Sequence, residues 1–94
     1  MDKVFDCFEW DERKELDNIQ KHGVDFFMAC KVFKDVKRKI YVDSKHTHDE
    51  ERLFCIGKAD GRIITVRFTY RNKKIRIIGA GYWRKGRQYY DQKD

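Results

Sequence analysis

The chain contains 94 residues, of which 40% are charged and 40% are hydrophobic, and its formal net charge is +6. This length predicts one small domain over residues 1–94, and the hydrophobic fraction argues against a disordered chain. The apolar runs are too short to span a membrane, and residues 1–6 lack the apolar stretch of a signal peptide. We therefore expect a cytoplasmic protein with no membrane partner.

The cysteines are widely spaced and odd in number: Cys7, Cys30 and Cys55. This pattern argues against a disulfide framework. No Cys-x-x-Cys pair is present to begin a structural zinc site with the histidines His22, His46 and His48. The acidic run over residues 49–51 is more typical of a solvated loop than of a metal site. We expect the cysteines to be buried as small hydrophobic residues, and we predict neither a metal site nor a cofactor.

The N-terminal third predicts a strand and then two helices. Residues 5–10 alternate loosely and are typical of a short strand. Asp11 is a good N-cap for a helix over residues 11–22, which Gly23 ends. Three positions of this helix fall at helical spacing: Leu16, Ile19 and Gln20. We interpret it as amphipathic.

Asp25 is expected to cap the second helix after a very short loop. Its predicted apolar face comprises Phe26, Phe27, Ala29, Cys30 and Phe33. Residues 34–49 are polar and irregular, apart from residues 39–42, which predict a short edge strand.

The second half predicts an antiparallel sheet. Its expected strands cover residues 51–57, 62–70 and 75–80. Asp60-Gly61 indicates a hairpin, residues 71–74 form a polar turn, and residues 84–92 have helical composition. The order of elements predicts an α+β fold, in which two N-terminal helices cover one face of a small antiparallel sheet and a short C-terminal helix follows.

Basic charge is concentrated near the C-terminus. Residues 58–90 contain ten basic residues and one acidic residue, so the rest of the chain is net acidic. Alternation along residues 62–70 places Ile64, Val66 and Phe68 on a core face, while Arg67 lies on the opposite face with Arg71 continuing it. Several cations on one surface repel each other unless an anion binds there.

Aromatic side chains interleave with these cations, a combination that suits single-stranded RNA. Tyr82 and Trp83 either stack on bases or pack the last helix onto the sheet, and both alternatives remain open. His22 is either a helix C-cap or a proton-transfer group. His46 and His48 fall in a polar loop, where a solvated role is most common.

Two sets of residues carry a family resemblance. The first comprises Phe8-Glu9-Trp10-Asp11, Asn18, Lys21-His22-Gly23, Phe26 and Val32-Phe33. The second comprises Asp43, His46, Glu51-Arg52, Ile56-Gly57, Thr69, Arg71 and Arg76-Ile77-Ile78. Their types and order resemble the BrnT toxins over nearly the whole chain.

The resemblance implies a RelE-like fold and a ribonuclease that blocks translation by cleaving RNA without a metal ion. It also implies a BrnA antitoxin, whose ribbon-helix-helix part binds the operon's own promoter DNA, so that the toxin joins a repressor complex. The implied catalytic residues are Arg71, Arg76, Arg84 and His22. The resemblance also carries over His46, and it implies that Lys21 and Arg52 bind RNA. The pattern of charge and aromatic residues adds four further RNA-binding residues, which are Arg67, Tyr82, Trp83 and Lys85. Arg52 is alternatively a structural ion-pair partner.

The chain departs from the family at one strand end. Many relatives carry Ser and Arg where this chain has Gly79 and Gly81. We expect Arg84 to supply the missing cation.

Two other functions fit the same residues. One is a non-catalytic module that binds RNA or DNA with its basic sheet face, and the other is a protein-interaction role in which the basic surface receives an acidic antitoxin segment.

Overall fold

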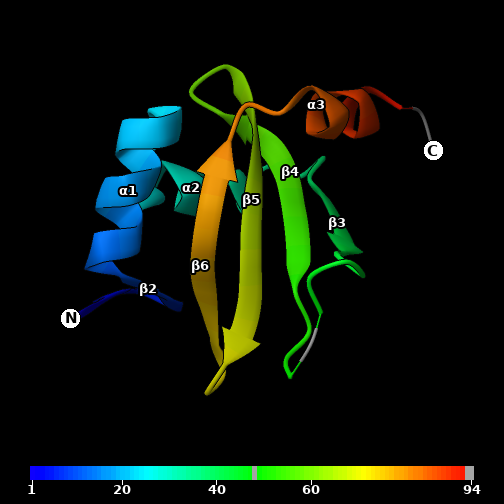
Figure 1. The fold of residues 1–94 in the computed structure, drawn as a ribbon. Coiled ribbons are helices and arrows are strands. Elements are labelled where there is room, and N and C mark those ends of the chain that lie inside the picture. The colour runs from blue at the N-terminus through cyan, green and yellow to red at the C-terminus, as the bar shows by residue number, and fades with distance from the viewer. Residues whose placement is uncertain (48, 93–94) are drawn as a thin grey trace.

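The computed structural model describes residues 1–47 and 49–92, which form a six-stranded sheet and three helices (Figure 1). In chain order the elements are β1 (Asp2–Phe5), β2 (Phe8–Asp11), α1 (Glu12–His22), α2 (Phe26–Val32), β3 (Lys39–Val42), β4 (Leu53–Ala59), β5 (Arg62–Arg71), β6 (Lys74–Gly81) and α3 (Arg84–Asp91). The predicted α+β class is confirmed. Within these residues, no helix is both long enough and apolar enough to cross a membrane.

The sheet has the strand order β1-β2-β6-β5-β4-β3 and is antiparallel except where β2 meets β6. That parallel contact is short, joining Phe8 to Ile75 and Glu9 to Arg76. The prediction of a single strand over residues 5–10 is wrong, because the chain reverses at Asp6 and forms a β1–β2 hairpin. Asp6 has a φ of 58°, a left-handed conformation that aspartate tolerates better than most residues.

Two tight hairpins join the central strands. Asp60 and Gly61 have φ values of 51° and 79°, and Asn72 and Lys73 have φ values of 52° and 64°. Two consecutive left-handed residues match the right-handed twist of the flanking strands. The hairpin predicted at Asp60-Gly61 is confirmed, and the β3 edge strand has the predicted bounds.

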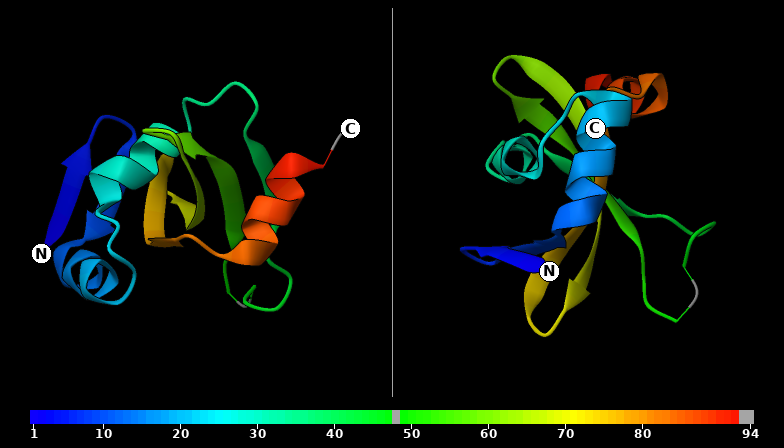
Figure 2. Two further views of the ribbon diagram at one scale, coloured as in Figure 1. Left: turned by 90° about the horizontal axis from the view of Figure 1, so that it is seen from above. Right: turned by 60° about the vertical axis from the view of Figure 1, so that its left-hand side comes forward.

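The main core lies between the sheet and α2, on the face of β5 that carries Val66 and Phe68. Phe33, at the end of α2, meets the Phe68 ring at 5.0 Å. Phe27, which we expected on the buried face of α2, is instead exposed and touches the rings of Phe5 and Trp10. The helix α3 lies across the opposite face of the sheet from α2 (Figure 2).

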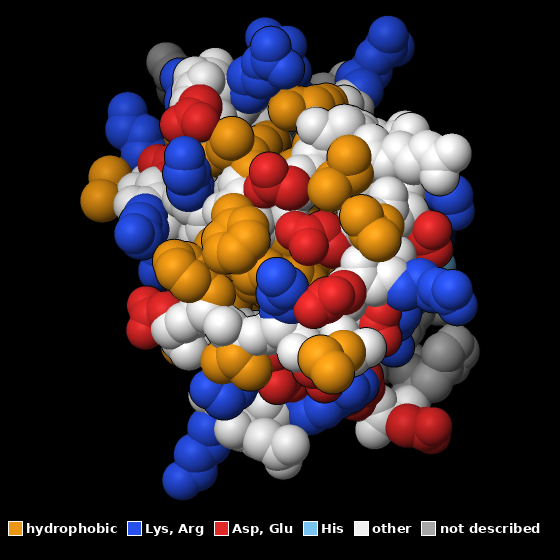
Figure 3. All heavy atoms as spheres, turned by 90° about the vertical axis from the view of Figure 1, so that its left-hand side faces the viewer, with side chains coloured by type: hydrophobic (Ala, Val, Ile, Leu, Met, Phe, Trp, Pro, Cys, Tyr) orange, Lys and Arg blue, Asp and Glu red, His pale blue; other side chains and the backbone are white. Residues whose placement is uncertain are grey.

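The burial of α1 differs from the amphipathic pattern that we expected. Leu16 and Ile19 are 66% and 40% exposed, and Figure 3 shows apolar side chains among charged ones on this side of the molecule. The buried residue of α1 is Asn18. Its Nδ2 donates to the carbonyls of Val24 and Ala80, both at 2.9 Å, and its Oδ1 accepts from the Ala80 N–H at 3.0 Å. A polar anchor, rather than an apolar stripe, therefore attaches α1 to β6.

Replacing Asn18 with alanine removes three hydrogen bonds from a buried site and leaves backbone groups of Val24 and Ala80 without partners. We expect the Asn18→Ala variant to lose about 2–4 kcal/mol of unfolding free energy. Urea denaturation followed by circular dichroism measures this loss. Gln20→Ala, at an exposed position of the same helix, is the matched control, and equal stability of the two variants would contradict the assignment.

Candidate functional site

Close packing at Gly86 positions α3 on the sheet. A Cβ atom at Gly86 would overlap the Oγ1 atom of Thr65, on the face of β5 opposite the core. At the C-terminal end of α3, Lys39 Nζ donates to the carbonyls of Tyr89 and Gln92 at 2.8 and 2.5 Å. The Tyr90 hydroxyl donates to Asp35 at 2.6 Å. These contacts fix α3 across the sheet and create a hollow on each side of it.

The first hollow, here called the hairpin pocket, lies beside the β4–β5 hairpin and has a volume of about 640 Å³. Its cationic lining residues are Lys58, Arg62, Arg84 and Arg87, and its aromatic residues are Tyr82 and Trp83. The Arg62 guanidinium lies 5.7 Å from the centre of the Tyr82 ring. The pocket therefore places positive charge beside exposed aromatic rings, an arrangement that suits phosphates linked to bases.

The second hollow, here called the loop pocket, lies between α3 and the loop that follows β3, with a volume of about 580 Å³. Its cations come from three separate segments: Lys45 in the loop, Arg67 on β5 and Lys85 on α3. Its aromatic lining residues are Tyr41, Phe54, Trp83 and Tyr89. Trp83 lines both pockets and therefore lies at the boundary between them.

Gly81 explains the position of the Trp83 ring. A Cβ atom at Gly81 would lie 3.0–3.1 Å from three atoms of the indole, so the ring rests directly on the strand backbone. On its other side the ring meets His22 edge-on, with the ring centres 5.2 Å apart. The lack of a side chain at position 81 therefore makes room for an aromatic ring, which remains 37% exposed.

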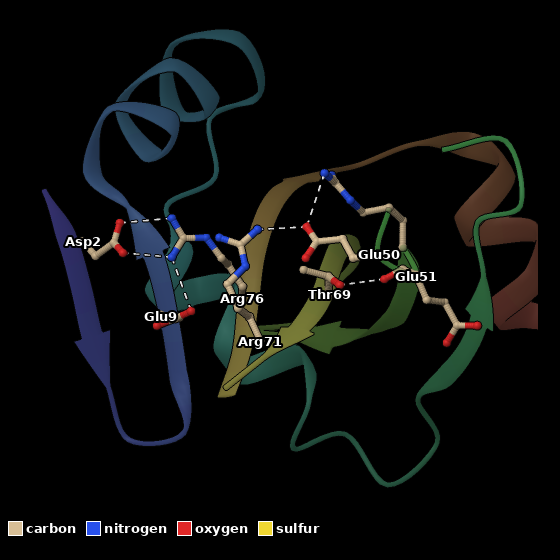
Figure 4. A network of polar contacts seen from close by, with 8 residues as sticks. Asp2, Glu9, Glu50, Glu51, Thr69, Arg71 and Arg76 are labelled. Atoms are coloured by element: carbon tan, nitrogen blue, oxygen red, sulfur yellow. Dashed lines mark hydrogen bonds and ion pairs between the residues drawn. The ribbon is translucent and has the colours of Figure 1, made fainter. Parts of the chain in front are cut away.

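Arg71 and Arg76 lie on the open sheet face but are paired with carboxylates (Figure 4). Arg76 binds both carboxylate oxygens of Asp2 at 3.0 Å and also pairs with Glu9 at 3.3 Å. Its side chain is 13% exposed, and these hydrogen bonds lower the pKa of Asp2 and raise that of Arg76. Arg71 pairs with Glu50 at 2.9 Å and is more exposed. We expected unpaired cations to gather on this face of the sheet. At this end of it, Arg71 and Arg76 are instead each paired with a carboxylate.

The structure brings most of the other predicted site residues to the two pockets. Arg84, Tyr82 and Trp83 line the hairpin pocket, and Arg67, Lys85 and Trp83 line the loop pocket. His22 contacts Trp83, and Lys21 is its exposed neighbour in the last turn of α1. Arg52 lies apart from both pockets, 3.6 Å from Glu50, as its alternative role as an ion-pair partner predicts.

The loop pocket holds a paired histidine and aspartate. Both residues belong to the set that carries the family resemblance, but their pairing was not predicted. His46 Nδ1 lies 2.7 Å from Asp43 Oδ2, and the Asp43 side chain is only 7% exposed. The spacing Asp-x-x-His was visible in the sequence, but burial of the aspartate was not, because the segment lacks regular structure. His48, which we considered with His46, lies outside the described residues.

Within the part of the chain that the structure describes, cysteines and carboxylates form no metal-binding group. Across residues 1–47 and 49–92, no three His, Cys, Asp or Glu side chains are grouped to hold a metal ion. Cys30 and Cys55 are buried, as expected, and burial raises the pKa of each thiol to about 12. Cys7 is exposed, so the expectation of burial is wrong for it.

One comparison with known proteins identifies the chain's relatives. The family model described as "Ribonuclease toxin, BrnT, of type II toxin-antitoxin system" matches residues 10–86. The matched region includes Asp43, His46, Arg67, Trp83 and Arg84, and it ends at the glycine that packs α3 onto the sheet. A search of curated proteins found no match.

The contact between α3 and the sheet can be tested at Gly86. Gly86→Ala should lower the unfolding free energy by about 1–3 kcal/mol, because the new methyl group overlaps Thr65. Trp83 fluorescence should report a displaced α3. Thr65→Ala should be close to neutral, since its buried hydroxyl has no hydrogen-bond partner among the described residues. Gln88→Ala, which is exposed on the same helix, is the control, and a neutral Gly86→Ala would refute the close packing.

The Arg76–Asp2 pair should make the β1–β2 hairpin sensitive to acid. The pKa of Asp2 is lowered from its usual value of 3.8. The ionised Asp2 carboxylate therefore stabilises the folded state fully above pH 3.8, and this stabilisation is lost as the pH falls through the lowered pKa. Arg76→Gln should abolish this contribution, so the stability difference between parent and variant should shrink between about pH 6 and about pH 2. Denaturation at several pH values and NMR titration of the Asp2 carboxyl test this, and a pH-independent difference would contradict it.

Proposed function

The chain belongs to the BrnT family of ribonuclease toxins of type II toxin–antitoxin systems, and we propose that it is a metal-independent endoribonuclease that inhibits translation. The observation that carries this proposal is the pair of pockets around Trp83, in which cations from different elements surround exposed rings. Within the part of the chain that the structure describes, Arg67, Arg84 and Arg87 form no ion pair with a carboxylate. These arginines are available to bind phosphate.

RNA carries its own nucleophile, the 2′-hydroxyl group next to each phosphate. A protein can therefore promote cleavage by holding the backbone in line, offsetting the developing charge and moving protons. In our proposal, Arg84 and Arg67 bind phosphates on either side of Trp83. Trp83 and Tyr82 stack on unpaired bases, an interaction worth about 1–3 kcal/mol per base.

The other predicted residues support this arrangement in different ways. We assign Arg71 to an outer phosphate contact, made by exchanging the carboxylate of Glu50 for a phosphate. Arg76 is a positioning residue, because Asp2 and Glu9 hold it against the β1–β2 hairpin. His22 orients the Trp83 ring, and Lys21 extends the positive surface beside it.

Family membership implies an antitoxin partner. We propose that this partner is a BrnA-type protein whose acidic segment covers the two pockets and neutralises their cations. Its ribbon-helix-helix part would bind operator DNA, so that the toxin joins a promoter-binding autorepressor complex. We further propose that residues 1–94 act as one toxin domain in the cytoplasm.

Incubating the purified protein with a defined single-stranded RNA in EDTA tests the proposal. We expect discrete cuts, mapped by primer extension, and a fall in rate on the order of 10- to 100-fold for Arg84→Ala. Arg13→Ala, on the exposed surface of α1, is the charge-matched control and should cleave at the parent rate. The same variants assayed in a translating extract show whether cleavage requires the ribosome.

Other outcomes would support the alternatives. If RNA is bound but intact in both assays, and its affinity falls steeply with salt, the protein is a nucleic-acid-binding module. If Arg84→Ala cleaves at the rate of Arg13→Ala, the phosphate role of Arg84 is wrong.

A further inference from the structure

We propose that His46 and Asp43 form the proton-transfer pair of the cleavage site, with His46 as the catalytic base and Asp43 as its positioning residue. The scissile phosphate would lie in the loop pocket, between Arg67 and Lys85. This inference rests on the proposed ribonuclease function and locates its chemistry in one of the two pockets. The family resemblance carried over His46 as a candidate functional residue, but the sequence assigned no proton-transfer role to His46 or to Asp43.

The geometry of the pair suits a base with a fixed orientation. A carboxylate only accepts hydrogen bonds, so Asp43 Oδ2, 2.7 Å from His46 Nδ1, holds the ring proton on Nδ1. The lone pair then lies on Nε2, which is the nitrogen that can accept a proton from a substrate. The Asp43 side chain is 7% exposed and that of His46 is 56% exposed. The pair is thus anchored inside the protein and open toward the pocket.

Backbone contacts fix the loop that carries the pair. The Asp43 N–H donates to the Arg52 carbonyl at 2.8 Å, and the Thr47 hydroxyl donates to the Asp43 carbonyl at 2.8 Å. Thr47 Oγ1 in turn accepts from the Arg52 N–H at 3.1 Å. These bonds join the loop to the start of β4. The residues on both sides of His46 are therefore tied to Arg52.

The surroundings of His46 supply the other groups that cleavage needs. Arg67 and Lys85 reach the same pocket from β5 and α3, so two elements provide cations for one phosphate. Tyr41 meets the rings of Phe54 and Tyr89 at 5.2 and 5.1 Å, which gives the pocket an aromatic wall. A nucleotide with an unstacked base fits this combination.

His22 is less suited to proton transfer. It contacts the Trp83 ring, and no carboxylate pairs with it among the residues that the structure describes. Among the described residues, His22 therefore lacks a carboxylate that would orient its ring for proton transfer.

The proposed step is an internal transfer at phosphorus. His46 Nε2 takes the proton of the 2′-hydroxyl while that oxygen bonds to the adjacent phosphorus. The bond between phosphorus and the 5′-oxygen of the next nucleotide breaks, and this oxygen takes a proton from water. The products are a 2′,3′-cyclic phosphate and a 5′-hydroxyl end, and the imidazolium returns its proton to solvent. Arg67 and Lys85 offset the charge that grows on the phosphate oxygens.

The test measures single-turnover cleavage by His46→Ala with and without added imidazole. We expect the rate to fall about 100- to 10,000-fold and to recover partly when imidazole occupies the vacated space. The Arg67→Ala variant should also cleave slowly, but imidazole should not raise its cleavage rate. The Asp43→Asn substitution should lower the cleavage rate less than His46→Ala does, and it should leave the affinity for RNA unchanged. Gln20→Ala controls for substitution outside the pocket, and urea denaturation of each variant reports any loss of folding.

The outcomes separate this inference from the function on which it rests. If the parent and Gln20→Ala cleave RNA and His46→Ala cleaves equally well, the inference is wrong and the ribonuclease function stands. If His46→Ala is slow and folded but imidazole does not restore it, the base role is also wrong, and the pair only holds the loop. If the parent leaves both naked RNA and translated RNA intact, the proposed function and this inference fail together. An RNA with a 2′-deoxy nucleotide at the cut site must remain uncleaved.

Discussion

Asn18 takes the place of a neighbouring strand along part of β6. The strand β2 pairs with β6 only as far as Arg76, so the backbone of Ala80 has no strand beside it on that side. The Asn18 carboxamide both donates to and accepts from Ala80, as a paired strand would. This contact fixes the end of α1, and hence His22, against the strand on which Trp83 rests. Both pockets share Trp83, so their geometry depends on one buried amide.

Charge is divided between two regions of the same sheet face. Near the β1–β2 hairpin, Asp2 and Glu9 compensate Arg76, and Glu50 compensates Arg71. Near α3 the arginines Arg62, Arg84 and Arg87 line a pocket together with the rings of Tyr82 and Trp83 and a single carboxylate, that of Asp91. Among the described residues, the arginines of the two pockets that form no ion pair with a carboxylate therefore lie next to exposed aromatic rings. The same separation allows the sheet to carry many arginines without strong self-repulsion.

Local patterns predicted the elements well, because caps and tight turns depend on neighbouring residues. Asp11, Gly23 and Asp60-Gly61 set their helix and hairpin boundaries as expected. Long-range partners were not predictable in the same way. The pattern that placed Leu16 and Ile19 inside could not show that Asn18 would find Ala80. Likewise, counting charges along the sequence located the basic region. It could not show that Glu50 pairs with Arg71, or that Asp2 and Glu9 pair with Arg76. The pair of Asp43 and His46 was hidden because only the folded loop buries the aspartate.

The attachment of α1 through Asn18 also has a consequence for the order of folding. The hydrogen bond between Asn18 and Ala80 joins residues 62 positions apart, and the β2–β6 pairing spans a similar distance. Such contacts form late, because the loop-closure entropy must be overcome before they contribute any stability. On a growing chain, α1 cannot take its final place until β6 has been synthesised. The two pockets that share Trp83 therefore cannot assemble while the first two thirds of the chain are being made.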